Sequence, residues 1–251
     1  MSKLLANFGV AITRPTDQAK RLSQLILKEG GNVIAFPLIE IVPLNNYSLF
    51  EHVISDLTPY DWVIFISSNA VQNGMPRMVK SGIPAHVKFA AIGPVTAQEL
   101  KQFGAKEVLI PNTRFDSESL LDLPEMHEIK NKKVMIVRGV GGRDVLAETL
   151  KKRGAEVTFA ECYRRINPQT NVDLLVKAWQ NHQLHAIVIT SSEAMRNLLD
   201  LAGDASWLKQ VSICANHARI ANTALEHGLR VWVTEAMGDE KMLATLCKLP
   251  V

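Results

Sequence analysis

The stretch VAITRPTDQAKRLSQLILKEGG, residues 10–31, sets a pattern that recurs along the whole chain. It opens with a short β-branched run, Val10 to Thr13, and continues over Thr16 to Glu29 with apolar residues at helical spacing. These apolar residues are Ala19, Leu22, Leu25 and Ile26. Because residues at this spacing share one face of an α-helix, and because Gly30 and Gly31 suit its end, we predict a strand followed by an amphipathic helix.

Further β-branched or apolar runs follow this first unit, and each precedes a helical or turn segment. The runs are Trp62 to Ile66, Phe89 to Ile92, Val108 to Ile110, Lys133 to Val137, Ala186 to Ile189, Val211 to Cys214 and Arg230 to Val233. Strands that alternate with helices form parallel sheets, because each crossover connection carries a helix over one face. The sequence therefore predicts an α/β fold with helices on both faces of a parallel sheet.

The composition of the 251-residue chain is that of an ordinary globular protein, with 47% hydrophobic and 21% charged residues, and its length suits two domains. The formal charge of +3 is too weak for a nucleic-acid-binding surface but fits a small anionic ligand. Three widely spaced cysteines indicate neither a disulfide framework nor a zinc site. No run approaches the roughly 20 apolar residues that span a bilayer, and no signal peptide is recognisable, so we expect a cytoplasmic protein without membrane contact.

The chain repeats itself at one fixed offset. Ser67 aligns with Ser191, an offset of 124 residues, and this offset aligns strands, turns and helix ends over most of the chain without a gap. Other aligned pairs are Val10 and Val134, Ile12 and Ile136, Arg14 and Arg138, Leu22 and Leu146, Gly30 and Gly154, Val33 and Val157, Ser68 and Ser192, Ala70 and Ala194, Asn73 and Asn197, Ala97 and Ala221, and Gly104 and Gly228. Chance similarity between βα units is the alternative, but one offset across so many features favours duplication.

Two extended stretches superpose at this offset, Phe36 to Pro43 and Ala160 to Asn167. Each ends near a proline, which resists helix formation. If the two halves form separate lobes, these stretches are natural linkers. Ligands of open α/β sheets bind beyond the carboxyl ends of the strands, so a two-lobed chain would offer a cleft at those ends.

The strongest local signal for anion binding is the loop RGVGGR from Arg138 to Arg143, which includes Gly139 and Gly142. It follows a predicted strand and opens a predicted helix, so that backbone N–H groups and two guanidinium groups can meet an anion. A dinucleotide fingerprint would need glycine in place of Asp144, and no phosphate-loop motif follows. A tight glycine turn with solvated arginines is the alternative interpretation.

Hydroxyl side chains and a glycine-proline turn mark three further junctions between a strand and a helix. The candidate residues there are Ser67, Ser68 and Asn69, then Thr190, Ser191 and Ser192, and finally Gly93, Pro94, Val95 and Thr96. The exposed N–H groups of a helix N-terminus attract carboxylate or phosphate groups. Helix capping alone also explains serine at such places. Arg14 adds a positive charge after the first predicted strand.

Tyr163 is the most informative single residue, because its counterpart at the fixed offset is the apolar Ile39. A phenol in a linker could donate a hydrogen bond or a proton to a ligand, although a structural tyrosine is the alternative. The spacing of His182 and His185 matches no metal-binding motif, so we expect no metal site. No nucleophile elbow and no activated cysteine is recognisable.

At these residues the chain resembles the uroporphyrinogen-III synthases, in one ordered set of motifs that covers nearly the whole sequence. Each motif alone is weakly specific. The set comprises Val10-Ala-Ile-Thr-Arg14-Pro15, Phe65-Ile-Ser-Ser-Asn-Ala-Val71, Ala91-Ile-Gly-Pro-Val-Thr-Ala97, Val137-Arg-Gly-Val-Gly-Gly-Arg143, Gly154-Ala-Glu-Val157, Cys162-Tyr-Arg-Arg165 and Thr190-Ser191.

The resemblance implies two flavodoxin-like α/β domains joined by a two-stranded linker ladder. The first domain would be discontinuous, residues 1–37 plus 168–251, and the second would span residues 43–160. Residues 38–42 and 161–167 would be the paired linker strands. This crossing of the chain follows from the resemblance and not from periodicity or spacing.

The resemblance also implies a reaction. The family cyclises hydroxymethylbilane, a linear tetrapyrrole with many carboxylates, to uroporphyrinogen III in the biosynthesis of haem and related tetrapyrroles. Water is lost, and ring D is inverted through a spiro intermediate. The family needs no metal or organic cofactor. Because the uncatalysed closure readily gives the wrong isomer, the enzyme's task is largely to hold one folded geometry of the substrate.

Carried over by position, Tyr163 matches the family tyrosine proposed to assist departure of the hydroxyl, and Thr96 matches a threonine of the cleft. The resemblance makes the remaining candidates substrate contacts: Arg14, Ser67, Ser68, Asn69, Gly93, Pro94, Val95, Arg138, Gly139, Gly142, Arg143, Thr190, Ser191 and Ser192. The chain departs from the family at residues 217–221, where HARIA replaces a glycine-threonine turn, and this leaves His217 unexplained.

The expected partner is the small-molecule substrate, with at most transient contact with the preceding enzyme of the pathway. We expect a monomer. The main alternative function is a non-catalytic, two-lobed protein that binds or senses an anionic metabolite, since such a protein also needs linkers and helix N-termini.

Overall fold

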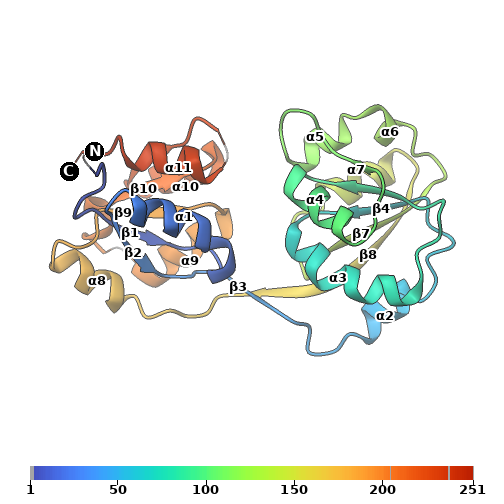
Figure 1. Ribbon diagram of the computed structural model, residues 1–251, viewed down its shortest axis with the longest axis horizontal. Coiled ribbons are helices and arrows are strands. Elements are labelled where there is room, and N and C mark those ends of the chain that lie inside the picture. Colours follow the sequence, from blue (N-terminus) through green and yellow to red (C-terminus); the bar gives the residue numbers. More distant parts are fainter. Residues whose placement is uncertain (1–2, 204, 237, 251) are drawn as a thin grey trace. The chain divides into compact units, whose positions relative to one another are not determined.

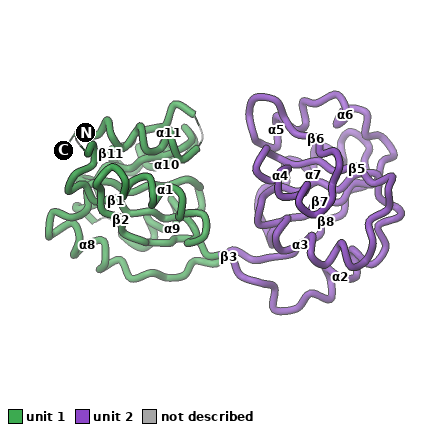
Figure 2. Tube along the Cα trace, in the orientation of Figure 1, with its two compact units in different colours: residues 1–40, 166–251 green, residues 41–165 purple. Residues whose placement is uncertain are grey.

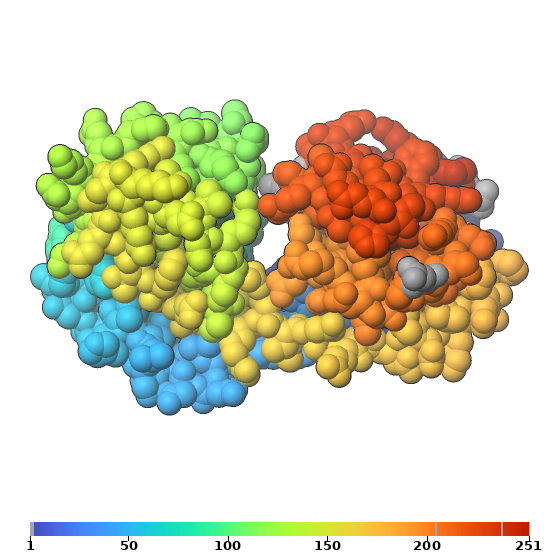
Figure 3. All heavy atoms as spheres, turned by 180° about the vertical axis from the view of Figure 1, so that it is seen from behind, coloured from blue at the N-terminus to red at the C-terminus, as the bar shows by residue number. Residues whose placement is uncertain are grey.

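The computed structural model describes residues 3–203, 205–236 and 238–250. The chain divides into two compact units: unit 1 comprises residues 1–40 and 166–251, and unit 2 comprises residues 41–165 (Figure 1, Figure 2). Unit 1 is therefore built from both ends of the chain. The space-filling view from behind shows the orange and red C-terminal part packed as one body, and the green middle of the chain belongs to the other unit (Figure 3).

Unit 1 contains a five-stranded sheet in the order β11-β10-β9-β1-β2, with all neighbouring strands parallel. Its strands are β1 (Gly9–Ile12), β2 (Asn32–Ala35), β9 (Ala186–Ile189), β10 (Ser212–Ala215) and β11 (Arg230–Val233). Its helices are α1 (Thr16–Lys28), α8 (Asp173–Gln180), α9 (Ser192–Ala202), the short 3-10 helix Leu208–Gln210, α10 (Ala218–Glu226) and α11 (Asp239–Leu246).

Unit 2 contains a six-stranded sheet in the order β3-β8-β7-β4-β5-β6. Its strands are β3 (Glu40–Val42), β4 (Trp62–Phe65), β5 (Lys88–Ala91), β6 (Val108–Leu109), β7 (Lys133–Gly139) and β8 (Glu156–Ile166). Its helices are α2 (Ser48–Ile54), α3 (Ser68–Ser81), α4 (Pro94–Gln102), α5 (Ser117–Leu121), α6 (Pro124–His127) and α7 (Val145–Lys152). The predicted α/β fold with helices on both faces of parallel sheets is confirmed.

The predicted repeat is confirmed at the level of whole elements. The offset of 124 residues carries β4 onto β9 and α4 onto α10 with identical bounds. It also carries the sheet order β6-β5-β4-β7-β8 of unit 2 onto the order β11-β10-β9-β1-β2 of unit 1. The two halves of the sequence have therefore exchanged their first strand and helix, because β1 and α1 lie with the elements of the second half.

The ungapped alignment is wrong at the last strand of the repeat. Phe89 pairs with Val108, and its counterpart Ile213 pairs with Val231 and not with Trp232. The offset is therefore 123 residues at β6 and β11. Only the register of the sheet reveals this shift. In the sequence, Gly104 and Gly228 still align at an offset of 124, so the ungapped alignment continues up to the last strand.

Each sheet is buried on both faces, as its continuous apolar strands require. In unit 2, Phe65 packs with α3 and α4 on one face, whereas Ile64 packs with α6 and α7 on the other. In unit 1, Ile12 and Val188 pack against α1 and α11. The described part of the chain contains no helix long and apolar enough to cross a membrane.

The two linker stretches carry more sheet structure than expected. β8 is eleven residues long, begins at Glu156 and pairs with β7 as far as Tyr163, so much of it belongs to the sheet of unit 2. β3 lies beside β8 at the edge of that sheet. The chain passes between the units at residues 40–41 and 165–166, where these neighbouring strands end or begin.

Candidate functional site

The candidate residues gather at the carboxyl ends of the strands, in one group for each unit. This edge is where open parallel sheets bind ligands, because helix N-termini and connecting loops converge there. The group of unit 2 comprises Ser67, Ser68, Asn69, Gly93, Pro94, Val95, Thr96, Arg138, Gly139, Gly142, Arg143 and Tyr163. The group of unit 1 comprises Arg14, Thr190, Ser191 and Ser192.

Tyr163 lies in the core of unit 2, and only 2% of its surface is exposed. Its hydroxyl lies 3.2 Å from Ser67 Oγ, a hydrogen bond in which either atom can donate. Its ring packs on Gly139, where a Cβ atom would lie 2.6 Å from Tyr163 Cε2. Any side chain at residue 139 would therefore displace the ring, and glycine there fixes the position of the phenol.

A β-bulge directs Tyr163 toward α3. Arg138 pairs with Glu161 and Gly139 pairs with Tyr163, so Cys162 is an extra residue in β8. Side chains of a regular strand alternate between faces, but across a bulge two successive side chains can face the same side. Cys162 and Tyr163 accordingly join the same core cluster. This local irregularity places the phenol beside Ser67.

Ser67 caps α3 as the sequence predicts. Its Oγ accepts a hydrogen bond from the backbone N–H of Ala70 at 3.2 Å. The same oxygen atom thus joins the N-terminus of the helix to the Tyr163 hydroxyl. Ser68 is the first residue of α3.

The N-terminus of α4 has no side-chain cap. Gly93 precedes the helix, and Pro94 is its first residue. Val95 is exposed, whereas Thr96 is buried. Because Gly93 offers no side-chain acceptor, the positive end of this helix dipole is open to an anionic ligand.

Arg138 is buried, and only 4% of its side chain is exposed. Its guanidinium donates to Asp144 Oδ1 at 2.7 Å, to the carbonyl of Gly139 at 3.3 Å and to the carbonyl of Gly141. It also lies 4.5 Å from the centre of the Phe159 ring. The guanidinium, which the sequence suggests as an anion-binding group, is instead committed to the glycine loop of its own unit.

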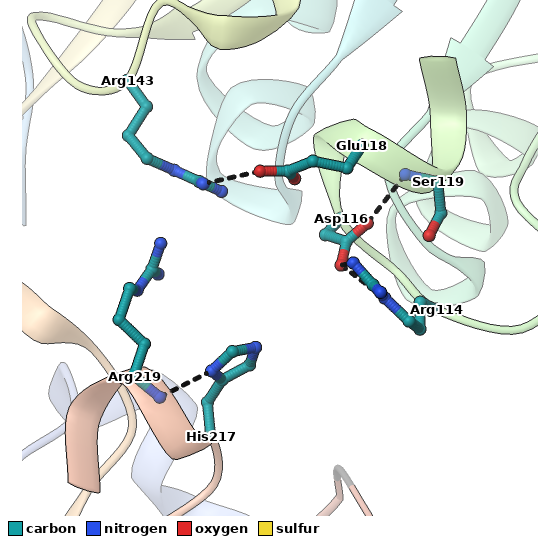
Figure 4. A network of polar contacts seen from close by, with 7 residues as sticks. All are labelled: Arg114, Asp116, Glu118, Ser119, Arg143, His217 and Arg219. Atoms are coloured by element: carbon teal, nitrogen blue, oxygen red, sulfur yellow. Dashed lines mark hydrogen bonds and ion pairs between the residues drawn. The ribbon is translucent and has the colours of Figure 1, made fainter. Parts of the chain in front are cut away.

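Arg143 lies at the far end of the same loop, with 51% of its side chain exposed. Its Nη1 donates to Glu118 Oε1 at 3.0 Å (Figure 4). Gly142 adopts φ +111°, and a Cβ there would lie 2.9 Å from Arg138 Nη2. The loop therefore requires glycine at residue 142, and among the predicted arginines Arg143 remains the most available to a ligand.

In unit 1, Arg14 is paired with a carboxylate that was not predicted from the sequence. Its Nη1 lies 2.5 Å from Asp239 Oδ1, and its Nε donates to Thr190 Oγ1 at 3.3 Å. Asp239 lies in the first turn of α11, a position that favours acidic residues but does not identify their partner. The repeat adds a parallel, because Arg14 and its counterpart Arg138 each bind an aspartate of their own unit.

The hydroxyls of the second serine pair differ in their surroundings. Ser191 caps α9 and accepts a hydrogen bond from the N–H of Ala194 at 3.0 Å. The Oγ of Ser192 is buried and has no hydrogen-bond partner among the described residues.

The structure explains His217, which caps α10. Its Nδ1 accepts a hydrogen bond from the backbone N–H of Arg219 at 3.1 Å (Figure 4). The ring thus replaces the hydroxyl or glycine that often precedes a helix.

The chemistry available in these two groups is hydrogen bonding, proton donation and charge stabilisation. Burial raises the pKa values of the Cys162 and Cys214 thiols to about 12, so neither is a thiolate at neutral pH. Within the described part of the chain, no cluster of three or more His, Cys, Asp or Glu residues is placed to hold a metal ion.

Comparison with known proteins identifies a family. The family described as uroporphyrinogen-III synthase HemD matches residues 20–244. The uroporphyrinogen-III synthase of Salmonella typhimurium is 32% identical over 244 residues, which cover 95% of this chain and 99% of the relative. The corresponding protein of Escherichia coli is 31% identical over 244 residues, with the same two coverages of 95% and 99%.

Solved structures show the same fold. A mutant uroporphyrinogen III synthase from Thermus thermophilus superposes with a TM-score of 0.66 at 18% identity, over 94% of this chain and 96% of that chain. The uroporphyrinogen-III synthetase of Helicobacter pylori superposes with a TM-score of 0.63 at 15% identity, over 94% of this chain and 97% of that chain. At these identities the likeness concerns the fold alone.

Proposed function

The chain belongs to the uroporphyrinogen-III synthase family of tetrapyrrole biosynthesis, and we propose that it converts hydroxymethylbilane to uroporphyrinogen III. In this reaction the substrate hydroxyl leaves as water, ring D is inverted through a spiro intermediate, and the macrocycle closes. The observation that carries the proposal is the family match over residues 20–244, which includes most of both units. It also favours this enzyme over a non-catalytic protein that binds an anionic metabolite.

The substrate carboxylates bind, in this proposal, to groups at the carboxyl ends of the strands. The N-termini of α3, α4 and α9 offer backbone N–H groups and the positive ends of helix dipoles. Arg143 offers a half-exposed guanidinium that can exchange Glu118 for a carboxylate of the substrate. Arg138 and Gly142 support this binding by fixing the loop that carries Arg143.

Tyr163 assists departure of the hydroxyl in the proposed mechanism. Its phenol donates a proton to the leaving hydroxyl, which departs as water and leaves an azafulvene-like cation. The cation is attacked by the substituted carbon of ring D, and the resulting spiro intermediate fragments and recloses. The final closure releases a proton from ring D as this ring becomes an aromatic pyrrole again. This proton restores the phenol of Tyr163. Ser67 holds the Tyr163 hydroxyl in position through the hydrogen bond of 3.2 Å.

Selection of the isomer requires orientation more than chemical activation. The substrate cyclises readily without an enzyme, but the ring D carbon that must attack is the substituted one. Holding the tetrapyrrole by several carboxylates limits its conformations before the cation forms, and this raises the effective concentration of the productive arrangement. The proposed steps are proton transfers and changes at carbon, so we propose no cofactor.

The test of the function is the isomer ratio of the product. Freshly prepared hydroxymethylbilane is incubated with and without the wild-type protein, and the products are oxidised and separated as porphyrin isomers. We expect the type III isomer to predominate with the protein and the type I isomer without it. Formation of the type I isomer at the spontaneous rate in both samples would refute the proposed activity.

We further propose that the protein acts as a cytoplasmic monomer and meets the enzyme that supplies hydroxymethylbilane only transiently. The three free cysteines, of which Cys162 and Cys214 are buried, suit a reducing compartment. Sedimentation velocity at micromolar concentration tests the assembly state, and a stable dimer would contradict the proposal.

A further inference from the structure

A row of polar side chains crosses the carboxyl edge of the sheet in unit 1. Thr190, Asn216 and Thr234 are the first residues after β9, β10 and β11. Ala215 pairs with Ile189 on one side and with Val233 on the other, so the three residues that follow lie side by side in the sheet register. The N–H of Thr234 donates to the carbonyl of Ala215 at 2.9 Å, which extends this pairing beyond the strands.

Two members of this row each have a buried side-chain oxygen atom without a hydrogen-bond partner among the described residues. Asn216 Oδ1 and Thr234 Oγ1 are inaccessible to solvent and have no partner among the described residues. Thr234 is 7% exposed as a residue. Such atoms are few in native proteins, because burying a polar group without a partner opposes folding. Their presence therefore calls for a compensating role.

The fold does not need polar groups at these places. In unit 2, the sheet register puts Ile66, Ile92 and Pro111 at the positions of Thr190, Asn216 and Thr234. Ile66 and Ile92 pack against an apolar cluster there. The two units share one sheet order, so the same edge can be built from apolar residues. Comparison of the two units therefore indicates that the polar residues at this edge of unit 1 are not required for folding.

The contacts of the row indicate what it binds. Arg14 forms an ion pair with Asp239, and its Nε donates a hydrogen bond to the Thr190 hydroxyl. Arg14 and Thr190 therefore already have partners within unit 1. The two atoms without partners are the amide oxygen of Asn216, which only accepts hydrogen bonds, and the hydroxyl of Thr234, which donates or accepts. A carboxylate cannot satisfy the amide oxygen, whereas an N–H group can.

We propose that Asn216 and Thr234 form a subsite that accepts the N–H group of a pyrrole ring of the substrate. The proposal rests on the function proposed above, in which the ligand is a tetrapyrrole with pyrrole N–H groups and acidic side chains. It assigns to unit 1 the recognition of a neutral part of the substrate. The carboxylates are left to the helix N-termini and to Arg143.

The experiment measures binding and stability in matched variants. Thr234→Val removes the hydroxyl but preserves the shape, and Thr234→Ser preserves the hydroxyl. For Thr234→Val we expect the KM for hydroxymethylbilane to rise about 5- to 10-fold, the effect of one hydrogen bond, with little change in kcat. The melting temperature should stay equal or rise, because an unpartnered buried hydroxyl is lost. Thr234→Ser should keep the wild-type KM.

Thr245→Val provides the control, because the Thr245 hydroxyl donates within α11 to the carbonyl of Lys241 at 3.0 Å. It should leave KM unchanged. Asn216→Leu should raise KM as Thr234→Val does, whereas Asn216→Asp should bind better than Asn216→Leu, because the carboxylate still accepts an N–H. A larger loss for Asn216→Asp than for Asn216→Leu would show that the subsite meets a carboxylate and would overturn the proposal.

A second measurement separates this proposal from the proposed function. The dissociation constant of uroporphyrinogen III is measured under anaerobic conditions for the wild type and for Thr234→Val. Wild-type KM and wild-type dissociation constant in Thr234→Val would overturn the subsite, because the hydroxyl would then contribute nothing to substrate binding. If the wild type forms no type III isomer but Thr234→Val weakens this binding, the synthase function fails and the subsite stands.

Discussion

Arg138 and Arg143 bound the same glycine loop, and their surroundings give them different roles. Arg138 holds the loop from within, and Arg143 is half exposed at its end. For Arg138→Gln we expect a loss of about 2 kcal/mol in the free energy of unfolding, because Asp144 and two carbonyls lose a charged donor. For Arg143→Gln we expect a change below about 0.5 kcal/mol, because exposed ion pairs contribute little.

Kinetic measurements complete this comparison. Arg143→Gln should raise the KM for hydroxymethylbilane several-fold while urea unfolding stays close to that of the wild type. The assignment would be wrong if Arg143→Gln changed stability alone, or if Arg138→Gln raised KM in a protein of unchanged stability.

The Tyr163 hydroxyl can be tested without disturbing the core. Tyr163→Phe keeps the ring on Gly139 and removes only the group that contacts Ser67. We expect kcat to fall at least several-fold while the melting temperature changes little. Tyr60→Phe, in a partly buried tyrosine of the same core cluster, is the control and should keep wild-type kinetics. Unchanged kcat and kcat/KM in Tyr163→Phe would remove this residue from the mechanism.

At this scale the sequence identifies residue types better than it identifies their partners. Arg14 follows β1 as predicted, whereas Arg138 lies inside β7, which extends two residues beyond its predicted end. The pairing of these arginines with Asp239 and Asp144 depends on loop conformation. The positive φ angles of Gly141 and Gly142 fold the loop back on Arg138, and no periodicity reports such angles. Asn216 and Thr234 become recognisable only when the register of two similar sheets can be compared.

At the scale of elements, the N-termini of α3 and α9 form a matched pair for experiment. Ser67 and Ser191 each accept a backbone N–H from the residue three positions on, at 3.2 Å and 3.0 Å. Replacing either serine by alanine should cost about 1 kcal/mol in the free energy of unfolding. Only Ser67→Ala should also lower kcat, because only Ser67 contacts Tyr163. Equal kinetics in the two variants would contradict the positioning role of Ser67.

The amino ends of β1 and β9 are joined through His185, and we expect this contact to weaken at low pH. Its Nδ1 accepts the N–H of Gly9 at 2.9 Å, and its ring stacks on Phe8. Burial first, and His182 second, lower the pKa of His185 below its ordinary value of 6.5. Because unfolding restores the higher pKa, the unfolded state binds the proton more readily, and this contribution to stability is lost as pH falls below about 6.5.

The corresponding measurement is thermal unfolding between pH 7.5 and pH 5.5. The wild type should lose more stability over this range than His185→Gln, which has no imidazole to protonate. Parallel curves for the two proteins would show that His185 does not couple folding to the proton.

The sequence predicted most of the strands within two residues, because buried parallel strands are short apolar runs that contrast with their surroundings. β2 escaped prediction as a strand, since its burial is partial. The bulge in β8 also escaped, because one extra residue at Cys162 leaves no pattern in the composition. That bulge decides which way Tyr163 points, so the orientation of the candidate catalytic group could not be predicted.

At the scale of the whole molecule, the repeat and the exchange of its first segments define which parts of the chain can fold alone. Unit 2 is continuous, whereas unit 1 needs both ends of the chain. β1 lies between β9 and β2, in the interior of its sheet. The sequence alone revealed the duplication but not this exchange, because an offset is the same whether or not neighbouring halves swap strands.

Fragments test this division. A fragment of residues 41–165 should unfold cooperatively on its own, because it contains every strand of its sheet except the first residue of β3 and the last residue of β8. A fragment of residues 166–251 should stay unfolded, because β1, β2 and α1 are missing. Adding residues 1–40 as a separate peptide should restore part of its circular dichroism. A cooperative transition in residues 166–251 alone would contradict the central role of β1.

The place of β1 in its sheet also sets an order of events on the ribosome. β1, β2 and α1 are synthesised first, but β1 finds its neighbour β9 only when residues 186–189 have emerged. Throughout the synthesis of unit 2, the apolar side chains of β1 and α1 therefore have no sheet to cover them. The unit that begins first is completed last, and until then the apolar residues of its N-terminal segment lack their packing partners in β9 and α11.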